Sequence, residues 1–182
     1  MKIIYIFIVF IIVSIAQIWV PIHMIMDSEK ALVSGKAYKF KTRPIDPTDP
    51  FRGKYITLQY EINRFNSKDS YIKGEEIYVY LKEDKEGFAE VSDVSKVLLP
   101  NKGDYVLANV IYDREDLVSF QLPFNVFYME ESKAYDAELA YNRINRDSSS
   151  NNVYALVYIK DDKAVLENVF IDDIPISEYV EK

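Results

Sequence analysis

An apolar run of 24 residues, from position 3 to position 26, contains no Asp, Glu, Lys or Arg. A helix needs about 20 apolar residues to cross the hydrocarbon core of a bilayer, so this run predicts a single transmembrane helix. Trp19 and His23 lie near its far end, where amphipathic rings suit the membrane interface. We therefore expect an N-terminal transmembrane anchor over residues 1–27 and one domain over residues 28–182.

A cleaved signal peptide is the competing interpretation, because Ser14 and Ala16 are small residues of the kind that precede a cleavage site. The following QIWVPIHMIM stays apolar well past that position, which favours a retained anchor. Lys2 and the amino terminus carry the only positive charges before the run, and the DSEK after it has no excess of Lys or Arg. The positive-inside bias then predicts a single-pass protein of the cell membrane with a cytoplasmic N-terminus and an extracytoplasmic domain.

Composition excludes several classes of function. The net charge of −7 argues against nucleic-acid binding, which needs a basic surface to displace the counterions of phosphates. The chain has no cysteine, so disulfides and thiolate metal sites are excluded. Its one histidine, His23, lies in the apolar run, which excludes a His-based metal site or a Ser-His-Asp triad in the domain. We expect no cofactor.

Apolar and polar residues alternate through most of the chain after residue 35, with the period of half-buried β-strands. The alternating stretches are KAYKFKT, YITLQYEI, EIYVYLK, LVSFQLP, VYALVYI and AVLENVFI. The KDDK between the last two predicts a hairpin turn, and DYVLANVIY, which is apolar on both faces, predicts a central strand. The 15 tyrosines and 10 phenylalanines agree with this, since aromatic rings pack well on a pleated surface.

One stretch has helical spacing instead. Ser132 is a suitable N-cap for a helix over residues 132–145. The apolar residues of that stretch recur three and four positions apart, at Ala134, Ala137, Tyr141 and Ile144. The predicted fold is therefore mainly β with one helix, a β-sandwich or barrel-like domain, preceded by a single N-terminal transmembrane helix. Two β subdomains, over residues 36–112 and 117–172, are an alternative; we favour one continuous unit, because about 70 residues make a thin core.

The stretch IDPTDPFRGKYITLQY forms a proline-rich approach to one of these strands. Its prolines hold the chain in extended or turn conformations, and Asp46 and Asp49 can bond nearby backbone amides. We expect Arg52 to pair with one of these aspartates and Gly53 to take a backbone conformation barred to other residues. The structural interpretation is a rigid loop that leads into a strand, and the functional one is a polar ledge that recognises a partner.

The same stretch resembles the GDYXXLXY protein family, which is named for its own motif. The motif residues here are Gly53, Lys54, Tyr55, Leu58 and Tyr60. The preceding RPIDPTDPFRG also matches the family's usual approach, and LPFNVFYMEESKAYDAEL with KAVLENVFID resembles its second conserved region. The family has aspartate where this chain has Lys54, a charge reversal that argues against a catalytic or metal-binding role for that position. The resemblance implies an N-terminal anchor, an extracytoplasmic domain and association with polytopic membrane proteins, and it supplies no established activity.

The two motif tyrosines are predicted to differ in burial. In a regular strand Tyr60 shares a face with Ile56 and Leu58, so it belongs to the core. Tyr55 lies on the opposite face, which either stays open or is covered by the proline-rich loop or by a partner chain. The first functional hypothesis is thus a non-enzymatic interaction module for a polytopic membrane protein or an envelope component, with Asp46, Asp49, Arg52, Gly53, Tyr55, Leu58 and Tyr60 as its motif residues.

Other hypotheses remain open. Ser28 lies just past the apolar run, where a membrane-anchored Ser-Lys peptidase would place its nucleophile, although no lysine lies in an apolar stretch that would make it a base. Tyr55, Tyr78 and Tyr80 would form a glycan- or small-ligand-binding face if all three point outward. DPTDP supplies only two carboxylates, too few for an oxygen-rich calcium loop.

Overall fold

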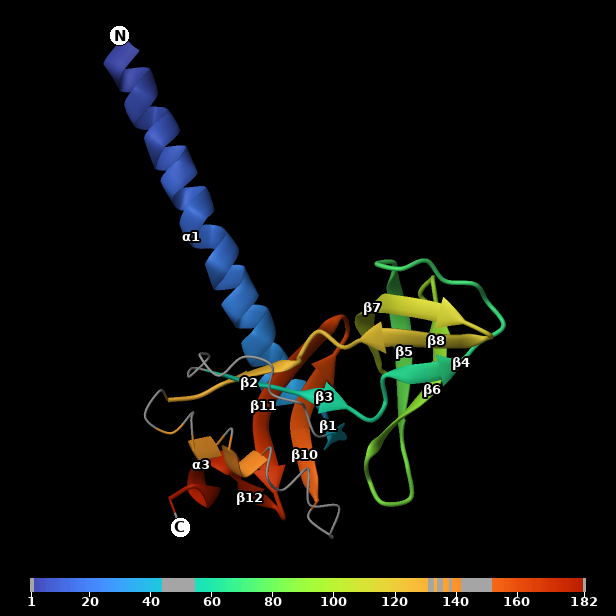
Figure 1. The fold of residues 1–182 in the computed structure, drawn as a ribbon. Coiled ribbons are helices and arrows are strands. Elements are labelled where there is room, and N and C mark those ends of the chain that lie inside the picture. Colours follow the sequence, from blue (N-terminus) through green and yellow to red (C-terminus); the bar gives the residue numbers. More distant parts are fainter. Residues whose placement is uncertain are drawn as a thin grey trace.

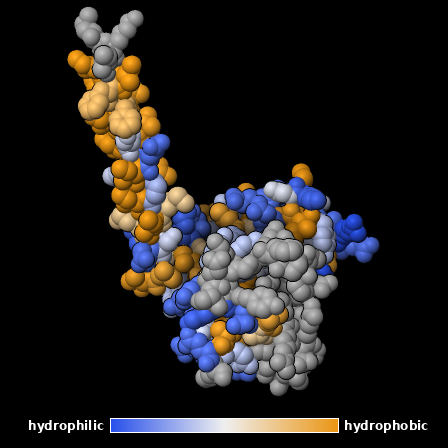
Figure 2. All heavy atoms as spheres, turned by 60° about the vertical axis from the view of Figure 1, so that its left-hand side comes forward, coloured by the Kyte–Doolittle hydropathy of each residue, from blue (hydrophilic) through white to orange (hydrophobic). Residues whose placement is uncertain are grey.

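The computed structural model describes residues 2–43, 55–130, 133, 136–137, 139–141 and 152–181. Its first element, α1 (Lys2–Ser34), is one continuous helix that projects from the folded body (Figure 1). The apolar part of α1 is exposed along its length and is long enough to cross a membrane. Figure 2 shows it as a mainly apolar column beside a body whose visible surface is more mixed.

A close backbone contact fixes the base of α1 to the β-rich body. The Gly35 N–H donates to the carbonyl of Ala31 at 2.8 Å, and Ala31 is fully buried. A Cβ at Gly35 would lie 2.3 Å from the Ala31 carbonyl oxygen and 2.9 Å from that of Ile159, so only glycine fits. The base of α1 also contacts the hairpin that contains Ile159. The helix therefore runs without a break into the body.

Two five-stranded sheets and a two-stranded ribbon make up the body (Figure 1). The C-terminal sheet has the spatial order β12 (Ile174–Pro175), β11 (Lys163–Ile171), β10 (Val153–Lys160), β1 (Lys36–Arg43) and β3 (Gln59–Tyr60). The barrel sheet has the order β4 (Arg64–Asn66), β8 (Leu117–Gln121), β7 (Tyr105–Arg114), β5 (Glu76–Glu83) and β6 (Ala89–Ser95). The motif ribbon pairs β2 (Tyr55–Thr57) with β9 (Val126–Tyr128). A short helix, α3 (Ile176–Tyr179), follows β12.

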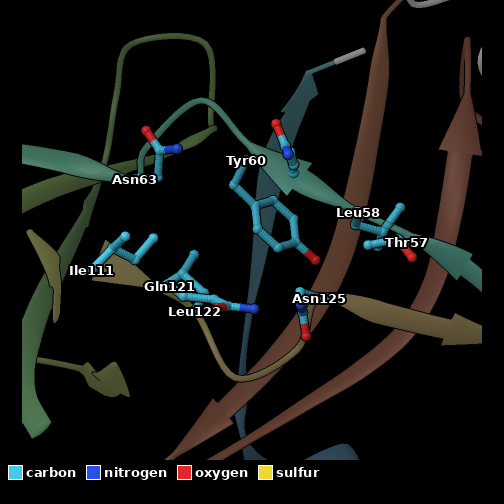
Figure 3. Close-up of a pocket in the computed structure, with 9 residues that line it drawn as sticks. Thr57, Leu58, Tyr60, Asn63, Ile111, Gln121, Leu122 and Asn125 are labelled. Atoms are coloured by element: carbon cyan, nitrogen blue, oxygen red, sulfur yellow. The ribbon is translucent and has the colours of Figure 1, made fainter. Parts of the chain in front are cut away.

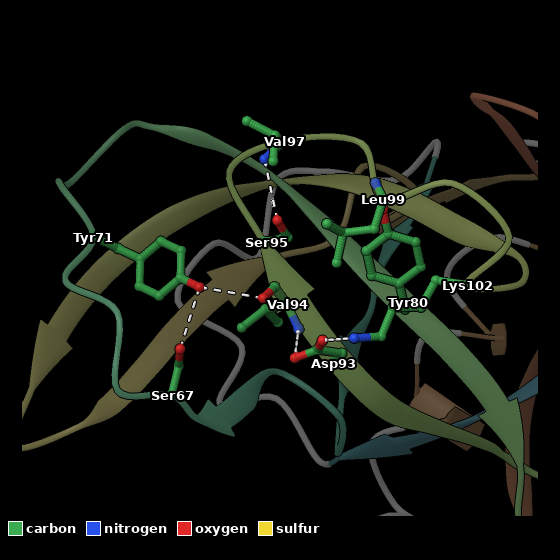
Figure 4. Close-up of polar contacts among 9 residues, drawn as sticks. All are labelled: Ser67, Tyr71, Tyr80, Asp93, Val94, Ser95, Val97, Leu99 and Lys102. Atoms are coloured by element: carbon green, nitrogen blue, oxygen red, sulfur yellow. Dashed lines mark hydrogen bonds and ion pairs between the residues drawn. The ribbon is translucent and has the colours of Figure 1, made fainter.

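The barrel sheet curls until its edge strands β4 and β6 come into contact, which makes it a nearly closed barrel. Tyr71, from the loop after β4, closes the seam between these edges (Figure 4). Its hydroxyl lies 3.3 Å from the Val94 carbonyl on β6, to which it donates, and 3.3 Å from the Ser67 hydroxyl just after β4. The Tyr71 amide donates to a carboxylate oxygen of Asp113 at 2.8 Å. Polar contacts thus hold together a seam that lacks a regular ladder of backbone bonds.

Strand β1 joins the two sheets. Its Tyr38 hydroxyl donates to Asp104 at 2.8 Å, just before β7, and Lys39 forms a backbone bridge with Phe88, just before β6. The inner faces of both sheets contribute to one continuous hydrophobic core. The subdomain boundary considered at residues 113–116 falls at the end of β7 and in the turn to β8, and β1 pairs with β10 from the far end of the chain.

The predicted fold class is confirmed: the chain is mostly β, with a barrel-like sheet and one long apolar N-terminal helix. The alternating stretches lie in strands, and the KDDK hairpin joins β10 to β11. DYVLANVIY forms β7, the central strand of the barrel sheet. Within the predicted helix over residues 132–145, the residues that the structure describes are helical, and Ala137 and Tyr141 are fully buried.

Candidate functional site

The motif strand changes sheets at Leu58. The residues before it, in β2, pair with β9, whereas Gln59 and Tyr60, in β3, pair with the end of β1. Burial keeps the predicted alternation across this change: Ile56, Leu58 and Tyr60 are buried, while Thr57 and Gln59 are exposed. The motif therefore lies where the motif ribbon, the C-terminal sheet and the barrel sheet meet.

Leu58 and Tyr60 hold the segment that connects β8 to β9. The Leu58 N–H donates to the carbonyl of Asn125 at 2.7 Å, and the Tyr60 hydroxyl donates to the carbonyl of Phe124, also at 2.7 Å. The rings of Phe40, Tyr60 and Phe124 pack edge to face, with centroids 4.9 to 5.6 Å apart. Burial, followed by the neighbouring Tyr141, raises the pKa of Tyr60 well above its usual range. Tyr60 therefore stays protonated and serves as a hydrogen-bond donor.

A pocket of about 270 Å³ opens beside Leu58 and Tyr60 (Figure 3). In the close-up, Tyr60 stands in the middle of the lining, with its hydroxyl directed toward the Asn125 side. Every residue of the lining is uncharged: Thr57, Leu58, Gln59, Tyr60, Asn63, Ile111, Gln121, Leu122 and Asn125. Four of these nine side chains are carboxamides, each with both a hydrogen-bond acceptor and donors. The pocket thus combines apolar walls with neutral hydrogen-bonding groups.

Two irregularities of the fold shape this pocket. Ile111 is the extra residue of a β-bulge in β7, because Val110 pairs with Phe120 and Tyr112 pairs with Ser119. Ile111 lines the pocket and remains 41% exposed. Bulges are common beside functional sites, where they redirect a side chain. Asn63 supplies the second irregularity: its side-chain oxygen is buried and has no hydrogen-bond partner among the described residues.

Tyr55 lies on the other face of the motif strand, in the motif ribbon. Its cross-strand partner is Tyr128, whose ring centroid is 5.7 Å away and whose side chain is 73% exposed. Tyr55 itself is half-buried. The two motif tyrosines therefore differ as predicted from strand register, since Tyr60 belongs to the core and Tyr55 to a partly covered face.

The remaining predicted motif residues, Asp46, Asp49, Arg52 and Gly53, lie outside the described residues, as does Lys54. The expected pairing of Arg52 with an aspartate therefore stays a prediction. The structure brings Leu58 and Tyr60 together at the pocket and places Tyr55 on another surface. Sequence reasoning missed Asn63, Gln121 and Asn125, which come from three separate loops or strand ends and carry no shared motif.

The predicted tyrosine face does not form. Tyr78 and Tyr80 lie in β5 of the barrel sheet, away from Tyr55 in the motif ribbon. Tyr80 is fully buried, and its hydroxyl accepts the Leu99 N–H at 2.6 Å (Figure 4). The loop that carries Leu99 covers a face that strand alternation alone leaves open. A glycan site made from these three rings together is therefore excluded.

Ser28 lies on the exposed surface of α1, and its hydroxyl donates to the carbonyl of Met24 at 3.0 Å. The nearest lysine in the sequence, Lys30, is exposed and forms an ion pair with Asp27 at 3.1 Å. A lysine that acts as a base has to be buried in an apolar environment, which the exposed Lys30 lacks. In the part of the chain that the structure describes, no group of three or more His, Cys, Asp or Glu side chains could hold a metal ion.

Comparison with known proteins agrees with the motif. The family model described as "GDYXXLXY protein" matches residues 17–169, which is most of the chain. A search of curated proteins and a search of solved structures gave no match. The match begins within α1, includes the motif strand and the pocket, and ends within β11. The chain belongs to the GDYXXLXY protein family.

Proposed function

We propose that this protein is a membrane-anchored, non-enzymatic interaction module that holds an uncharged segment of a membrane or envelope partner in the pocket beside its motif. The observation that carries the proposal is the lining of that pocket, in which all nine side chains are uncharged. Acid–base and nucleophilic catalysis need a group with a suitably tuned pKa next to the reacting atoms. The Tyr60 hydroxyl is instead engaged with a backbone carbonyl and keeps its proton.

Carboxamides suit a partner's main chain. An amide group offers an acceptor and two donors, so Gln59, Gln121 and Asn125 can pair with the C=O and N–H groups of an extended peptide. Leu58 and Leu122 add apolar contact on the floor of the pocket. Ligand sites commonly combine apolar walls with a few polar groups that fix orientation. The preferred partner is a loop of a polytopic membrane protein, which would lie near the end of the anchor.

The anchor supports the proposed location. The apolar surface of α1 between residues 4 and 26 is exposed throughout, a state that water would disfavour strongly and a bilayer would favour. Lys2 lies before the apolar run, and the DSEK after the run has no excess of Lys or Arg, which favours a cytoplasmic N-terminus and an extracytoplasmic body. The tight junction at Gly35 would then hold the body in a fixed position relative to the membrane.

Photocrosslinking in intact cells tests the interaction. A photoreactive amino acid at Gln121, which lines the pocket, should give a defined adduct with one partner. The matched control is Glu90, an exposed residue of β6 outside the pocket lining, which should give no such adduct. Equal adducts at both positions, or none at Gln121, would contradict the proposal.

The location and the competing enzyme hypothesis have their own tests. The full chain should stay in the membrane fraction after alkaline extraction, and mass spectrometry should find Met1 or Lys2 at its start. A mature protein that starts at Gln17 would identify α1 as a cleaved signal sequence. Protease added to spheroplasts should remove the body. Labelling of Ser28 by an active-site serine probe would instead favour a hydrolase.

The exposed ring of Tyr128 favours glycan binding as a second candidate function. Tyr128 exposes most of its ring beside Tyr55, and exposed aromatic pairs can stack on sugar rings. A glycan array probed with the wild-type body and with a Tyr128→Ala variant tests this second candidate. Binding that the variant loses would place a glycan site on the motif ribbon, separate from the pocket.

A further inference from the structure

The carboxamide of Gln17 interrupts the apolar surface of α1 close to the middle of the membrane. This inference rests on the retained anchor of the proposed function. Gln17 lies roughly 4 Å from the centre of the apolar run over residues 3–26, at 1.5 Å per helical residue. Its side chain is exposed, and none of the described residues forms a hydrogen bond with it.

A second polar group lies at the same depth. Pro21 lies inside α1 and has no N–H, so the carbonyl of Gln17, four residues earlier, lacks its usual intrahelical donor. Water does not reach the hydrocarbon core to replace that donor. One residue therefore carries both a side-chain amide and a backbone carbonyl that need hydrogen-bond partners inside the membrane.

These groups share one face of the helix. At 100° per residue, Ser14, Gln17 and Pro21 fall within a stripe about 60° wide. Trp19 and His23, which stack with ring centroids 5.0 Å apart, lie on the opposite side. The spacing of three and four residues is that of the contact seam between two parallel helices. Polar groups in membrane helices usually face another helix, where they form interhelical hydrogen bonds.

We propose that a second copy of this chain packs against this face, in a parallel pair of α1 helices joined by hydrogen bonds between their Gln17 side chains. A carboxamide is both donor and acceptor, so Gln17 is complementary to itself. Copies with one sequence insert with one orientation, and each therefore presents Gln17 at the same depth. The free Gln17 carbonyl accepts a second hydrogen bond from the partner's carboxamide. A two-fold axis along the membrane normal allows all of these contacts to occur in both directions.

The absence of cysteine from the chain allows a direct test by disulfide crosslinking of the full protein in native membranes. Phe10 and Met24 lie seven residues on either side of Gln17 and share its face. Ile8 and Met26 lie nine residues away, on the opposite face, at nearly the same depths. Single cysteines at Phe10 and Met24 should give several-fold more crosslinked dimer under oxidation than cysteines at Ile8 and Met26.

A second substitution tests whether Gln17 itself holds the pair. Gln17→Leu, added to each cysteine variant, should abolish the difference between the two faces, while Gln17→Asn should retain it. Pro21→Ala restores an N–H for the Gln17 carbonyl and should weaken the crosslink. Equal crosslinking on both faces, no effect of Gln17→Leu, or crosslinking only to a different protein would overturn the proposal.

Membrane extraction of the same samples distinguishes a failure of the proposed helix pairing from a failure of the proposed anchor. If the Gln17→Leu chain stays in the membrane but the wild type shows no face preference, the pairing is wrong and the anchor stands. If the wild-type chain leaves the membrane on alkaline extraction or starts at Gln17, the anchor is wrong and the pairing falls with it.

Discussion

The Tyr60 hydroxyl donates a hydrogen bond to the backbone carbonyl of Phe124, 2.7 Å away, and the ring of Phe124 packs edge to face against the ring of Tyr60. The next carbonyl along the chain, that of Asn125, accepts the N–H of Leu58. The two buried residues of the motif thus hold two consecutive peptide groups of the segment between β8 and β9. This segment forms one wall of the pocket, so the motif stabilises the fold and shapes the candidate site together.

Two substitutions of Tyr60 should separate the contribution of its hydrogen bond to stability from that of its buried ring. Tyr60→Phe keeps the ring but leaves the Phe124 carbonyl without its donor, so it should lower the free energy of unfolding by about 1–3 kcal/mol. Tyr60→Ala also removes a buried ring and should cost about 3–5 kcal/mol. Urea unfolding of the full chain in detergent micelles, followed by circular dichroism, measures both. Tyr128→Ala is the control, because this exposed ring should cost under about 1 kcal/mol. A loss at Tyr60 no larger than at Tyr128 would contradict the buried register.

Replacing Asn63 should have the opposite effect on the free energy of unfolding. Its buried side-chain oxygen has no hydrogen-bond partner among the residues that the structure describes, whereas its backbone carbonyl accepts from the Phe120 N–H at 3.0 Å and from the Ser119 hydroxyl. Asn63→Leu removes the unsatisfied oxygen and keeps both backbone contacts, so the free protein should become equally or more stable, by up to about 1–2 kcal/mol. Unfolding in urea measures this change. The crosslinked adduct from Gln121 should weaken in the same variant, because binding sites often retain polar groups at a cost in stability. A destabilised Asn63→Leu variant would show that the amide supports the fold.

Most strand faces could be predicted from alternation, because most residues that point into the core are apolar whichever strand they pair with. The same argument explains what was missed at Leu58. The period of two continues through residues 55–60, although β2 pairs with β9 and β3 pairs with β1. Alternation shows which side chains face the core, and it does not show which strand lies alongside. The pattern of apolar and polar residues therefore does not predict that the sheets meet at Leu58 and form the pocket.

Tyr80 and Ile111 show two further limits. The alternation of EIYVYLK places Tyr80 on the outward face of its strand, yet the loop containing Leu99 covers this residue. Alternation carries no information about loops that cover a sheet. Ile111, together with Tyr105 and Leu107, makes the sequence of β7 apolar on both faces, whereas a bulge at Ile111 places this residue in the lining of the pocket. The carboxamides of the pocket are polar residues at strand ends, which by themselves predict only turns and solvent-exposed positions.

Alkaline pH should destabilise the protein through Tyr38. Burial, followed by the hydrogen bond to Asp104, raises the pKa of Tyr38 from 10.0 to about 12. A raised pKa in the folded state means that the unfolded chain loses this proton first, so stability is fully present below pH 10 and falls as pH rises toward about 12. Tyr38→Phe should make the loss over this window shallower, by on the order of 2 kcal/mol. Urea unfolding of both proteins across the window measures the slopes. An unchanged slope would mean that the other buried tyrosines, whose pKa values are also raised, account for it.

The junction at Gly35 should tolerate no side chain. A Cβ there would meet two backbone oxygens, those of Ala31 and Ile159, which cannot rotate away as a flexible side chain would. Gly35→Ala should therefore separate the base of α1 from β10 and destabilise the protein by on the order of 2 kcal/mol.

Limited proteolysis in detergent micelles measures this directly, because cleavage between α1 and β1 requires the junction to open. The Gly35→Ala chain should be cut several-fold faster there than the wild type. Ser34→Ala is the matched control: it removes the exposed hydroxyl that contacts Lys160 at 2.5 Å and adds no atom. Its cleavage rate should stay near that of the wild type, since exposed substitutions usually change stability by less than about 0.5 kcal/mol. Equal cleavage of the two variants would mean that the helix and the body are not held together by this contact, and that the body is free to change its orientation relative to α1.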